Sequence, residues 1–285
     1  MPGASKPQDL KPNLSHDANM IDVLTHNRDA WNDDAHQSES PWCQPVDEQL
    51  IARARLGDWE VVLTPLINVP KNWFGDVKDK NILCLASGGG QQAPILAAAG
   101  ANVTSFDRSE AQLAKDELVA QRERLDIDLV CGDMVDLSCF DAGQFQLIFH
   151  PVSNVFASNV RSIWQECSRV LMTSGRLLSG FMNPDFFLFD LDAVEAGGPL
   201  LVCNRLPYCD VENLSAASLQ ARIDRGEALE FSHSLNDQIG GQLEAGFVIA
   251  GFYEDRWNNE ATPLNEYMPT SMATLAIKAS TENLD

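Results

Sequence analysis

The sequence predicts an α/β fold with a doubly wound, mostly parallel seven-stranded sheet and an antiparallel C-terminal strand. Apolar, β-rich runs recur between residues 81 and 182 and alternate with stretches of helical spacing. The first of these runs ends at three consecutive glycines, Gly88 to Gly90, which open a helix. Two further apolar runs follow near the C-terminus without a helix between them, so we expect them to pair antiparallel.

The residues before this alternation predict an N-terminal helical cap over 17–80. A first helix is expected from Asp17, because apolar and amide side chains share one face at helical spacing. These are Met20, Val23, Leu24, Asn27 and Trp31. A second, short helix is expected over 46–56, directly after Pro45. Residues 1–16 are polar and contain prolines, so we expect a disordered tail there.

The core is expected over 81–285, with an insertion at about 185–235 after strand five. Strands are predicted at 81–87, 102–107, 127–132, 145–150, 175–182, 247–254 and 272–278. Helices are predicted at 91–99, 109–125, 159–171 and 236–245, with one more near 214–225 inside the insertion. Strands joined through helices of this length require right-handed crossovers and a parallel sheet.

The composition limits the partners. The net charge is −21, and the acidic excess is greatest after residue 180. Such a surface repels phosphate backbones and anionic lipid, so we expect no nucleic-acid or membrane partner. The seven cysteines contain no C-x-x-C pair, which favours reduced thiols in the cytoplasm and no metal site.

Two acids and a glycine turn indicate an adenosine-type ligand. The run from Gly88 to Ala93 satisfies the G-x-G-x-x-G/A pattern. This pattern occurs in proteins that bind NAD, so by itself it does not identify the ligand. Asp107 ends the second strand, where a carboxylate can accept the two ribose hydroxyls. Asp133 follows the third strand at the same carboxyl edge of the sheet.

At these motifs the chain resembles the class I S-adenosylmethionine-dependent methyltransferases, which have a Rossmann-like fold. The resemblance covers 81–182 motif by motif and 236–279 by pattern. CLASGGGQQ and HNRDAWN also resemble a bacterial branch of that family. The resemblance implies that the cofactor is S-adenosyl-L-methionine. It places the Gly loop at the methionine part of the cofactor, Asp107 at the ribose, and Asp133 and Met134 at the adenine. The full set of expected cofactor-binding residues is Ala86, Ser87, Gly88, Gly89, Gly90, Gln91, Asp107, Arg108, Gln112, Asp133, Met134 and His150.

Two positions depart from the family pattern. Cys84 stands where the first strand usually carries an acid, and Ala86 stands where the loop usually begins with Gly. The missing acid removes one polar anchor near the cofactor's ammonium group. Gln91 is a candidate to replace it.

The methyl acceptor is predicted to be a small molecule. The methyl group is expected to pass to it by an in-line displacement. His150 lies at the edge of strand four, where a general base could act if the acceptor arrives protonated; a hydrogen-bonded loop histidine is the alternative. Further substrate candidates are Ser153, Asn154, Trp31, Phe186, Tyr208 and His233. The run from His150 to Ser153 departs from the Asn/Asp-Pro-Pro-aromatic motif that serves nucleobase and glutamine amino groups.

Two other functions remain open at this point. An NAD(P)-dependent oxidoreductase fits the glycine pattern, but no tyrosine is followed four residues later by lysine; the residues there are Glu212, Trp257 and Ser271. A non-catalytic protein that binds S-adenosylmethionine or S-adenosylhomocysteine is the second alternative. The acceptor atom, the pathway and the choice between monomer and homodimer are left undecided by the sequence.

Overall fold

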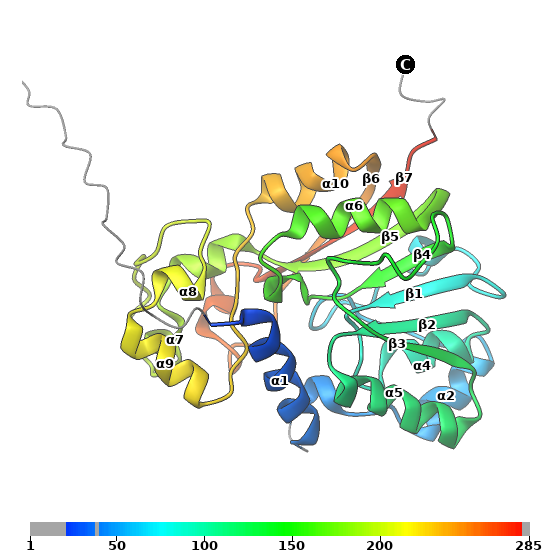
Figure 1. The fold of residues 1–285 in the computed structure, drawn as a ribbon, viewed down its shortest axis with the longest axis horizontal. Helices are drawn as coiled ribbons and strands as arrows, with labels where there is room; N and C mark the ends of the chain where they lie inside the picture. Colours follow the sequence, from blue (N-terminus) through cyan, green and yellow to red (C-terminus); the bar gives the residue numbers. More distant parts are fainter. Residues whose placement is uncertain (1–20, 38–39, 281–285) are drawn as a thin grey trace, which may run out of the picture.

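A central sheet lies between two layers of helices (Figure 1). The computed structural model describes residues 21–37 and 40–280. The expected tail over 1–16 and the first residues of the helix expected from Asp17 lie outside the described residues. The described part of that helix, α1, runs from Val23 to His36, and the Asp22 side chain caps it by accepting the Thr25 N–H.

The sheet has seven strands in the order β3-β2-β1-β4-β5-β7-β6. Only β7 runs antiparallel to its neighbours, β5 and β6, so the predicted fold class is confirmed. The strands are β1 (Asn81–Leu85), β2 (Asn102–Asp107), β3 (Ile127–Cys131), β4 (Phe145–His150), β5 (Leu171–Met182), β6 (Phe247–Asp255) and β7 (Ser271–Lys278). The strand expected from 175 begins at Leu171, directly after the preceding helix, because Leu171 already pairs with Phe145 of β4.

Both faces of the sheet are buried, as a parallel sheet requires. In β1, Ile82 and Cys84 face one apolar core, while Leu83 and Leu85 face the other. The first core is covered by α2 (Glu48–Arg55), α3 (Lys71–Phe74), α4 (Gln92–Ala98) and α5 (Glu110–Glu123). The second is covered by α6 (Val160–Val170), and α10 (Gly241–Glu244) packs on α6 and β6.

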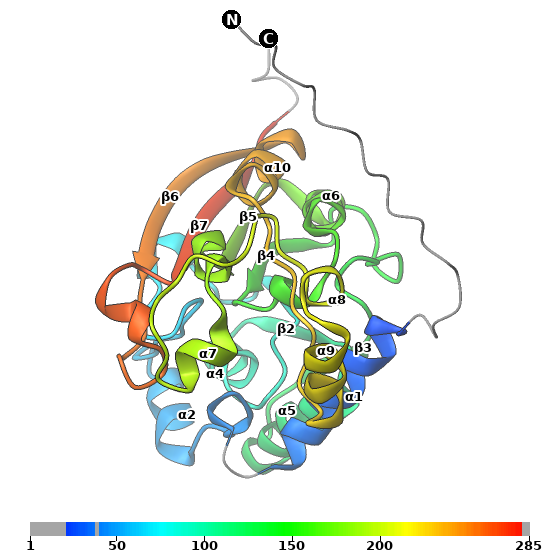
Figure 2. The same cartoon turned by 90° about the vertical axis from the view of Figure 1, so that its left-hand side faces the viewer.

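The insertion after β5 holds several short helices. They are η3 (Pro184–Leu188), α7 (Leu191–Glu195), α8 (Asp210–Asn213) and α9 (Ala216–Asp224). The sequence predicted only the last of them. In Figure 2, α7, α9 and α1 lie in front of the sheet, so the insertion and the N-terminal helix, which are far apart in the sequence, gather over the same part of it.

The helix expected over 236–245 is a π turn, Asn236–Gly240, that continues into α10. The described residues also form the 3-10 turns η1 (Pro41–Cys43), η2 (Asn154–Phe156) and η5 (Pro263–Glu266). Within 21–37 and 40–280, no helix has both the length and the apolar character to cross a membrane.

Candidate functional site

A cavity of about 370 Å³ lies at the carboxyl edge of the parallel strands. Parallel strands end together at this edge, and α/β proteins bind ligands there. The wall is formed by the loops after β1, β2, β3 and β4, by one face of α1, by the insertion and by the loop after β6. The α1 face consists of Leu24, Asn27, Arg28 and Trp31, which repeat at the helical spacing that the sequence shows.

Asp107 connects the Gly loop with the start of α5. One carboxylate oxygen accepts the Gly88 N–H at 3.0 Å, and the other accepts the Ser109 N–H at 2.9 Å. Burial raises the pKa of Asp107, and these N–H groups oppose that shift. A carboxylate has about four acceptor positions, so two remain for hydroxyl groups in the cavity. Ser109, and not Asp107, caps α5 by accepting the Gln112 N–H.

Two buried polar atoms beside Asp107 have no hydrogen-bond partner among the described residues. They are the Ser87 hydroxyl oxygen and the Gln112 side-chain oxygen, and both residues line the cavity. A buried polar atom that stays unpaired destabilises the fold by about 1–3 kcal/mol. A polar ligand at this position would satisfy both, so the residues present fit a ligand with hydroxyl and amino groups.

Asp133 and Met134 line the same cavity beyond Asp107. The Asp133 carboxylate accepts one hydrogen bond from Arg108 and one from the Val135 N–H. The ion pair with Arg108 joins the loops after β2 and β3 and holds Asp133 at the edge. The structure thus brings together the residues expected at the ribose and at the adenine.

Gly89 and Gly90 do not line the cavity. A Cβ on Gly89, whose φ is +116°, would overlap the Trp42 carbonyl oxygen, and a Cβ on Gly90 would lie 3.0 Å from Pro45. The glycines therefore permit a close approach of the chain segment 41–46, which covers the loop from outside, and not of a ligand. Gln91 belongs to the same contact, because its amide donates to the carbonyl oxygens of Pro41 and Gln44.

Asp116 of α5 holds the Gly loop from the interior of the fold and does not line the cavity, whereas Gln91 does. It is fully buried, and its two oxygens accept the Gly90 N–H at 2.8 Å and the Ser105 hydroxyl at 2.6 Å. Burial, and secondly Asp116, raise the pKa of the Cys84 thiol, so the acid lies beside the position where the family usually carries one on β1. Sequence reasoning missed it, although an acid on the otherwise apolar face formed by Leu113 and Val119 is a visible signal.

Ala86 adopts a left-handed conformation, with φ +48°. The family that the chain resembles usually has Gly at this position, and the left-handed conformation is the physical reason. The left-handed region destabilises a residue with a Cβ by about 1–2 kcal/mol.

We expect Ala86→Gly to raise the free energy of unfolding by about 0.5–1 kcal/mol, after the greater freedom of Gly in the unfolded chain is subtracted. Thermal and urea unfolding measure this change. The matched control is Ala97→Gly in α4, which lies in an ordinary helix and should lower the stability by about 1 kcal/mol. A lower stability of the Ala86→Gly protein would contradict the strain at this residue.

Three of the predicted substrate residues line the cavity: Trp31, Ser153 and Phe186. The Trp31 ring meets Phe156 of η2 edge-on, with 5.1 Å between the ring centroids. Phe186 comes from the start of the insertion, next to Met182 at the end of β5. An aromatic and apolar compartment thus adjoins the polar edge around Asp107 and Asp133.

His150 is not at the cavity, which corrects the expectation of a base or a cofactor contact at this residue. Its ring is fully buried at 6.0 Å from Trp164, and Nδ1 donates to the Leu85 carbonyl at 3.0 Å. Burial lowers the pKa of His150 to about 4. A neutral, enclosed imidazole of this kind supports the packing between β1, β4 and α6.

Asn154, Tyr208 and His233 are also absent from the cavity wall. The Asn154 side-chain amide exchanges two hydrogen bonds with Gln238, and the Asn154 backbone carbonyl accepts the His233 Nε2–H. The Tyr208 hydroxyl donates to Asp210. These three side chains hold the insertion against η2 and the π turn. In the described part of the chain, no three His, Cys, Asp or Glu side chains gather as metal ligands would.

The comparison with known proteins decides the family. Residues 83–179 match the family described as a methyltransferase domain. A protein of Bacillus subtilis (strain 168), described as the uncharacterized methyltransferase YbaJ, is 46% identical over 256 residues, which cover 90% of this chain and 98% of that protein. The chain belongs to the class I S-adenosylmethionine-dependent methyltransferases.

Solved structures share the fold of this methyltransferase. A Listeria monocytogenes protein assigned to the S-adenosylmethionine-dependent methyltransferases superposes with a TM-score of 0.58 at 17% identity, covering 80% of this chain and all of that one. An S-adenosylmethionine-dependent methyltransferase from Mesorhizobium loti gives 0.55 at 15% identity, covering 73% and 94%. These two structures therefore show that the overall fold of this chain is a methyltransferase fold.

Proposed function

We propose that this methyltransferase binds S-adenosylmethionine along Ser87, Asp107 and Asp133 and transfers its methyl group to a small molecule in the adjoining aromatic compartment. The observation that carries this proposal is the continuity of one cavity, from Asp107 at the sheet edge to Trp31 and Phe186 under the insertion. A volume of about 370 Å³ suits small ligands. The net charge of −21 argues against a nucleic acid as the acceptor.

Each residue at the cofactor end has a definite part. Asp107 would accept the ribose hydroxyls, Asp133 the adenine amino group, and Met134 would pack against the base. Ser87 and Gln112 line the same cavity, and each has a buried oxygen without a hydrogen-bond partner among the described residues, which suits the polar amino-acid part. The sulfonium of the bound cofactor supplies an electrophilic methyl carbon.

The protein's own contribution to methyl transfer is to align the reactants and to exclude water. Holding a nucleophile in line with the methyl carbon removes most of the entropic barrier. The aromatic wall formed by Trp31, Phe156 and Phe186 keeps water from the reacting atoms. The segment 41–46 and α1 complete the enclosure from the N-terminal side.

Calorimetry with S-adenosylmethionine, S-adenosylhomocysteine and NAD tests the proposal. We expect binding of both sulfur ligands in the micromolar range and no binding of NAD. Tight NAD binding without a response to the other two would indicate an oxidoreductase. Incubation with a metabolite extract and detection of product mass then separates a methyltransferase from a non-catalytic binder, since only transfer produces S-adenosylhomocysteine.

A further inference from the structure

Glu230 faces the cavity with a carboxylate that makes no hydrogen bond and no ion pair with any described residue. It lies in the insertion, between α9 and the π turn, and it lines the cavity together with Trp31 and Phe156. Sequence reasoning gave no weight to this residue, because nothing within the run from Leu229 to Phe231 distinguishes it from any acid in a surface loop.

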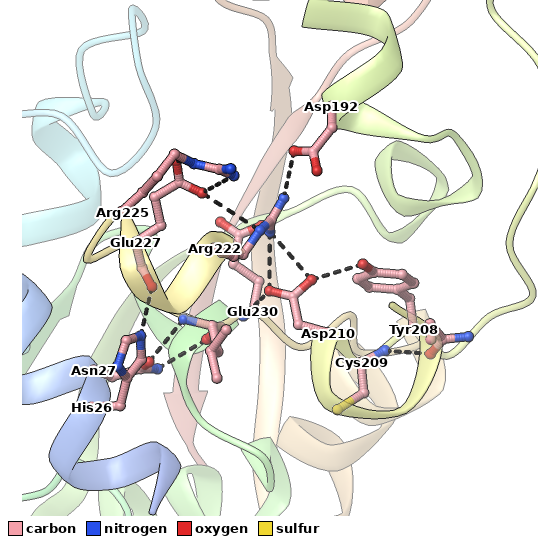
Figure 3. Close-up of polar contacts among 12 residues, drawn as sticks. His26, Asn27, Asp192, Tyr208, Cys209, Asp210, Arg222, Arg225, Glu227 and Glu230 are labelled. Carbon is pink, nitrogen blue, oxygen red and sulfur yellow. Dashed lines mark hydrogen bonds and ion pairs between the residues drawn. The ribbon is translucent and has the colours of Figure 1, made fainter. Parts of the chain in front are cut away.

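The backbone around Glu230 is fixed at three consecutive residues by three different elements. The Asn27 amide of α1 accepts the Leu229 N–H at 2.8 Å and donates to its carbonyl at 2.9 Å. The Glu230 N–H donates to Asp210 at 2.8 Å, and the Phe231 N–H donates to the Val155 carbonyl at 2.7 Å. Figure 3 shows Asn27 and Asp210 on either side of this run. The backbone is thus held rigidly beside η2, while the side chain of Glu230 stays unpaired.

The charges around Glu230 leave a surplus of negative charge. Asp210 lies beside it and is paired with Arg222, and Arg222 also pairs with Asp192 (Figure 3). Glu227 pairs with Arg225 and Arg222, and Glu195 of α7 lines the cavity without a hydrogen-bond or ion-pair partner among the described residues. Among the described residues no cation forms an ion pair with Glu230: Arg222 attracts it without contacting it, because Arg222 is already paired with Asp210 and Asp192.

The cations of the cavity wall are also in use. Arg28 pairs with Asp29, and Arg108 pairs with Asp133. An anionic acceptor would therefore meet two unpaired carboxylates and no free cation among the described residues of the wall. A protonated amine would meet the opposite charge, together with aromatic faces that attract cations.

We propose that the methyl acceptor is a small amine and that Glu230 is the catalytic residue that pairs with its ammonium group and takes its proton. This inference rests on the proposed methyl transfer. One N–H proton passes to the Glu230 carboxylate, and the freed lone pair on nitrogen forms the new N–CH₃ bond. The carbon–sulfur bond breaks with its electron pair left on sulfur, and Glu230 then returns the proton to solvent. Burial, and secondly the neighbouring Asp210, raise the pKa of Glu230 to about 7, which makes it a stronger base than an ordinary carboxylate.

Binding of amine probes tests the inference without turnover. The probes are benzylamine and phenethylamine, with benzyl alcohol and phenylacetate as uncharged and anionic counterparts. They are titrated by calorimetry into the S-adenosylhomocysteine complex. We expect the amines to bind at least tenfold more tightly than phenylacetate, and we expect this affinity to fall as the pH drops through 7, where Glu230 gains a proton. Equal binding of amine and carboxylate, or no amine binding at millimolar concentration, overturns the proposal.

Variants assign the effect to the side chain. Glu230→Gln should lower amine affinity about tenfold, remove its pH dependence near 7, and lower kcat for an amine acceptor by about 10²- to 10⁴-fold. The matched control is Glu212→Gln, which removes the same charge from an exposed position of the insertion outside the cavity and should leave amine binding unchanged. Binding of S-adenosylhomocysteine tests the proposed function separately. If the wild-type protein does not bind S-adenosylhomocysteine, that function is refuted. Unchanged amine binding in Glu230→Gln, with S-adenosylhomocysteine still bound, refutes only this inference.

Discussion

Replacement of Asp116 by Ala is expected to lower the free energy of unfolding by about 2–5 kcal/mol at pH 5. The side chain is fully buried and accepts the Gly90 N–H and the Ser105 hydroxyl. Removal leaves both donors buried without a partner, at about 1–3 kcal/mol each. Urea unfolding followed by circular dichroism measures the change. Glu117→Ala, an exposed acid on the same helix, is the control and should alter the stability by less than about 0.5 kcal/mol.

Asp116→Asn should separate the hydrogen bonds from the charge. Burial raises the pKa of Asp116 from 3.8 to about 7, so the folded chain keeps a proton that the unfolded chain loses between these values. The stability that this proton provides is complete below about pH 4, falls as the pH rises, and is lost above pH 7. Asn carries no charge at any of these pH values. Relative to wild type, the Asn variant should therefore gain stability by roughly 1.4 kcal/mol per pH unit across this window.

Unfolding at pH 4, 5, 6, 7 and 8 tests this linkage. A constant difference between the Asn variant and wild type would show that Asp116 is ionised throughout. The same proteins allow cofactor affinity to be compared, since Gly90 belongs to the loop that Asp116 holds. We expect the Ala variant to bind S-adenosylhomocysteine more weakly than the Asn variant does.

Asp107→Ala has the second large expected effect, on cofactor affinity. The variant loses the acceptors that we propose for the ribose hydroxyls and also the two hydrogen bonds that hold Gly88 and Ser109. We expect a loss of roughly 2–4 kcal/mol in binding free energy. This corresponds to a rise of about 30- to 1,000-fold in the Kd for S-adenosylmethionine. Calorimetry at pH 7.5 provides the measurement.

The control for Asp107 is Asp128→Ala, which removes an equal charge from an exposed position on the neighbouring strand β3. It should bind the cofactor as wild type does. An equal loss of cofactor affinity in both variants would show that the change in net charge causes the loss, and not the position of Asp107. Unchanged affinity in Asp107→Ala would remove this residue from the site.

The α/β core was predictable because its signals are local. The alternation of apolar runs and helical stretches over 81–182 reflects a sheet buried on both faces, and each strand carries that requirement in its own residues. The same holds for Asp107 and Asp133. Asp107 ends β2 and Asp133 comes two residues after the end of β3, and parallel strands end at one edge, so the two acids had to meet there.

His150 shows where this local reasoning stops. It ends β4 at the same edge, yet its ring points to α6 and the core, where Trp164 and the Leu85 carbonyl enclose it. Position along a strand gives the edge, but the direction of a side chain at the strand end depends on what packs against each face. Packing also decided the surroundings of the three glycines. Gly88 lines the cavity, while Gly89 and Gly90 leave room for the segment 41–46.

The sequence by itself determined the family's sheet, the Gly loop and the acids at the carboxyl edge of the sheet, because hydrophobic period and strand ends are properties of neighbouring residues. Only the tertiary structure decided which residues form the aromatic compartment of the cavity. Asn27 holds the backbone of Leu229, 202 positions away in the chain, and this contact brings α1 and Glu230 to one wall. Contacts of this kind depend on how separate elements pack, and no local pattern in the chain encodes them.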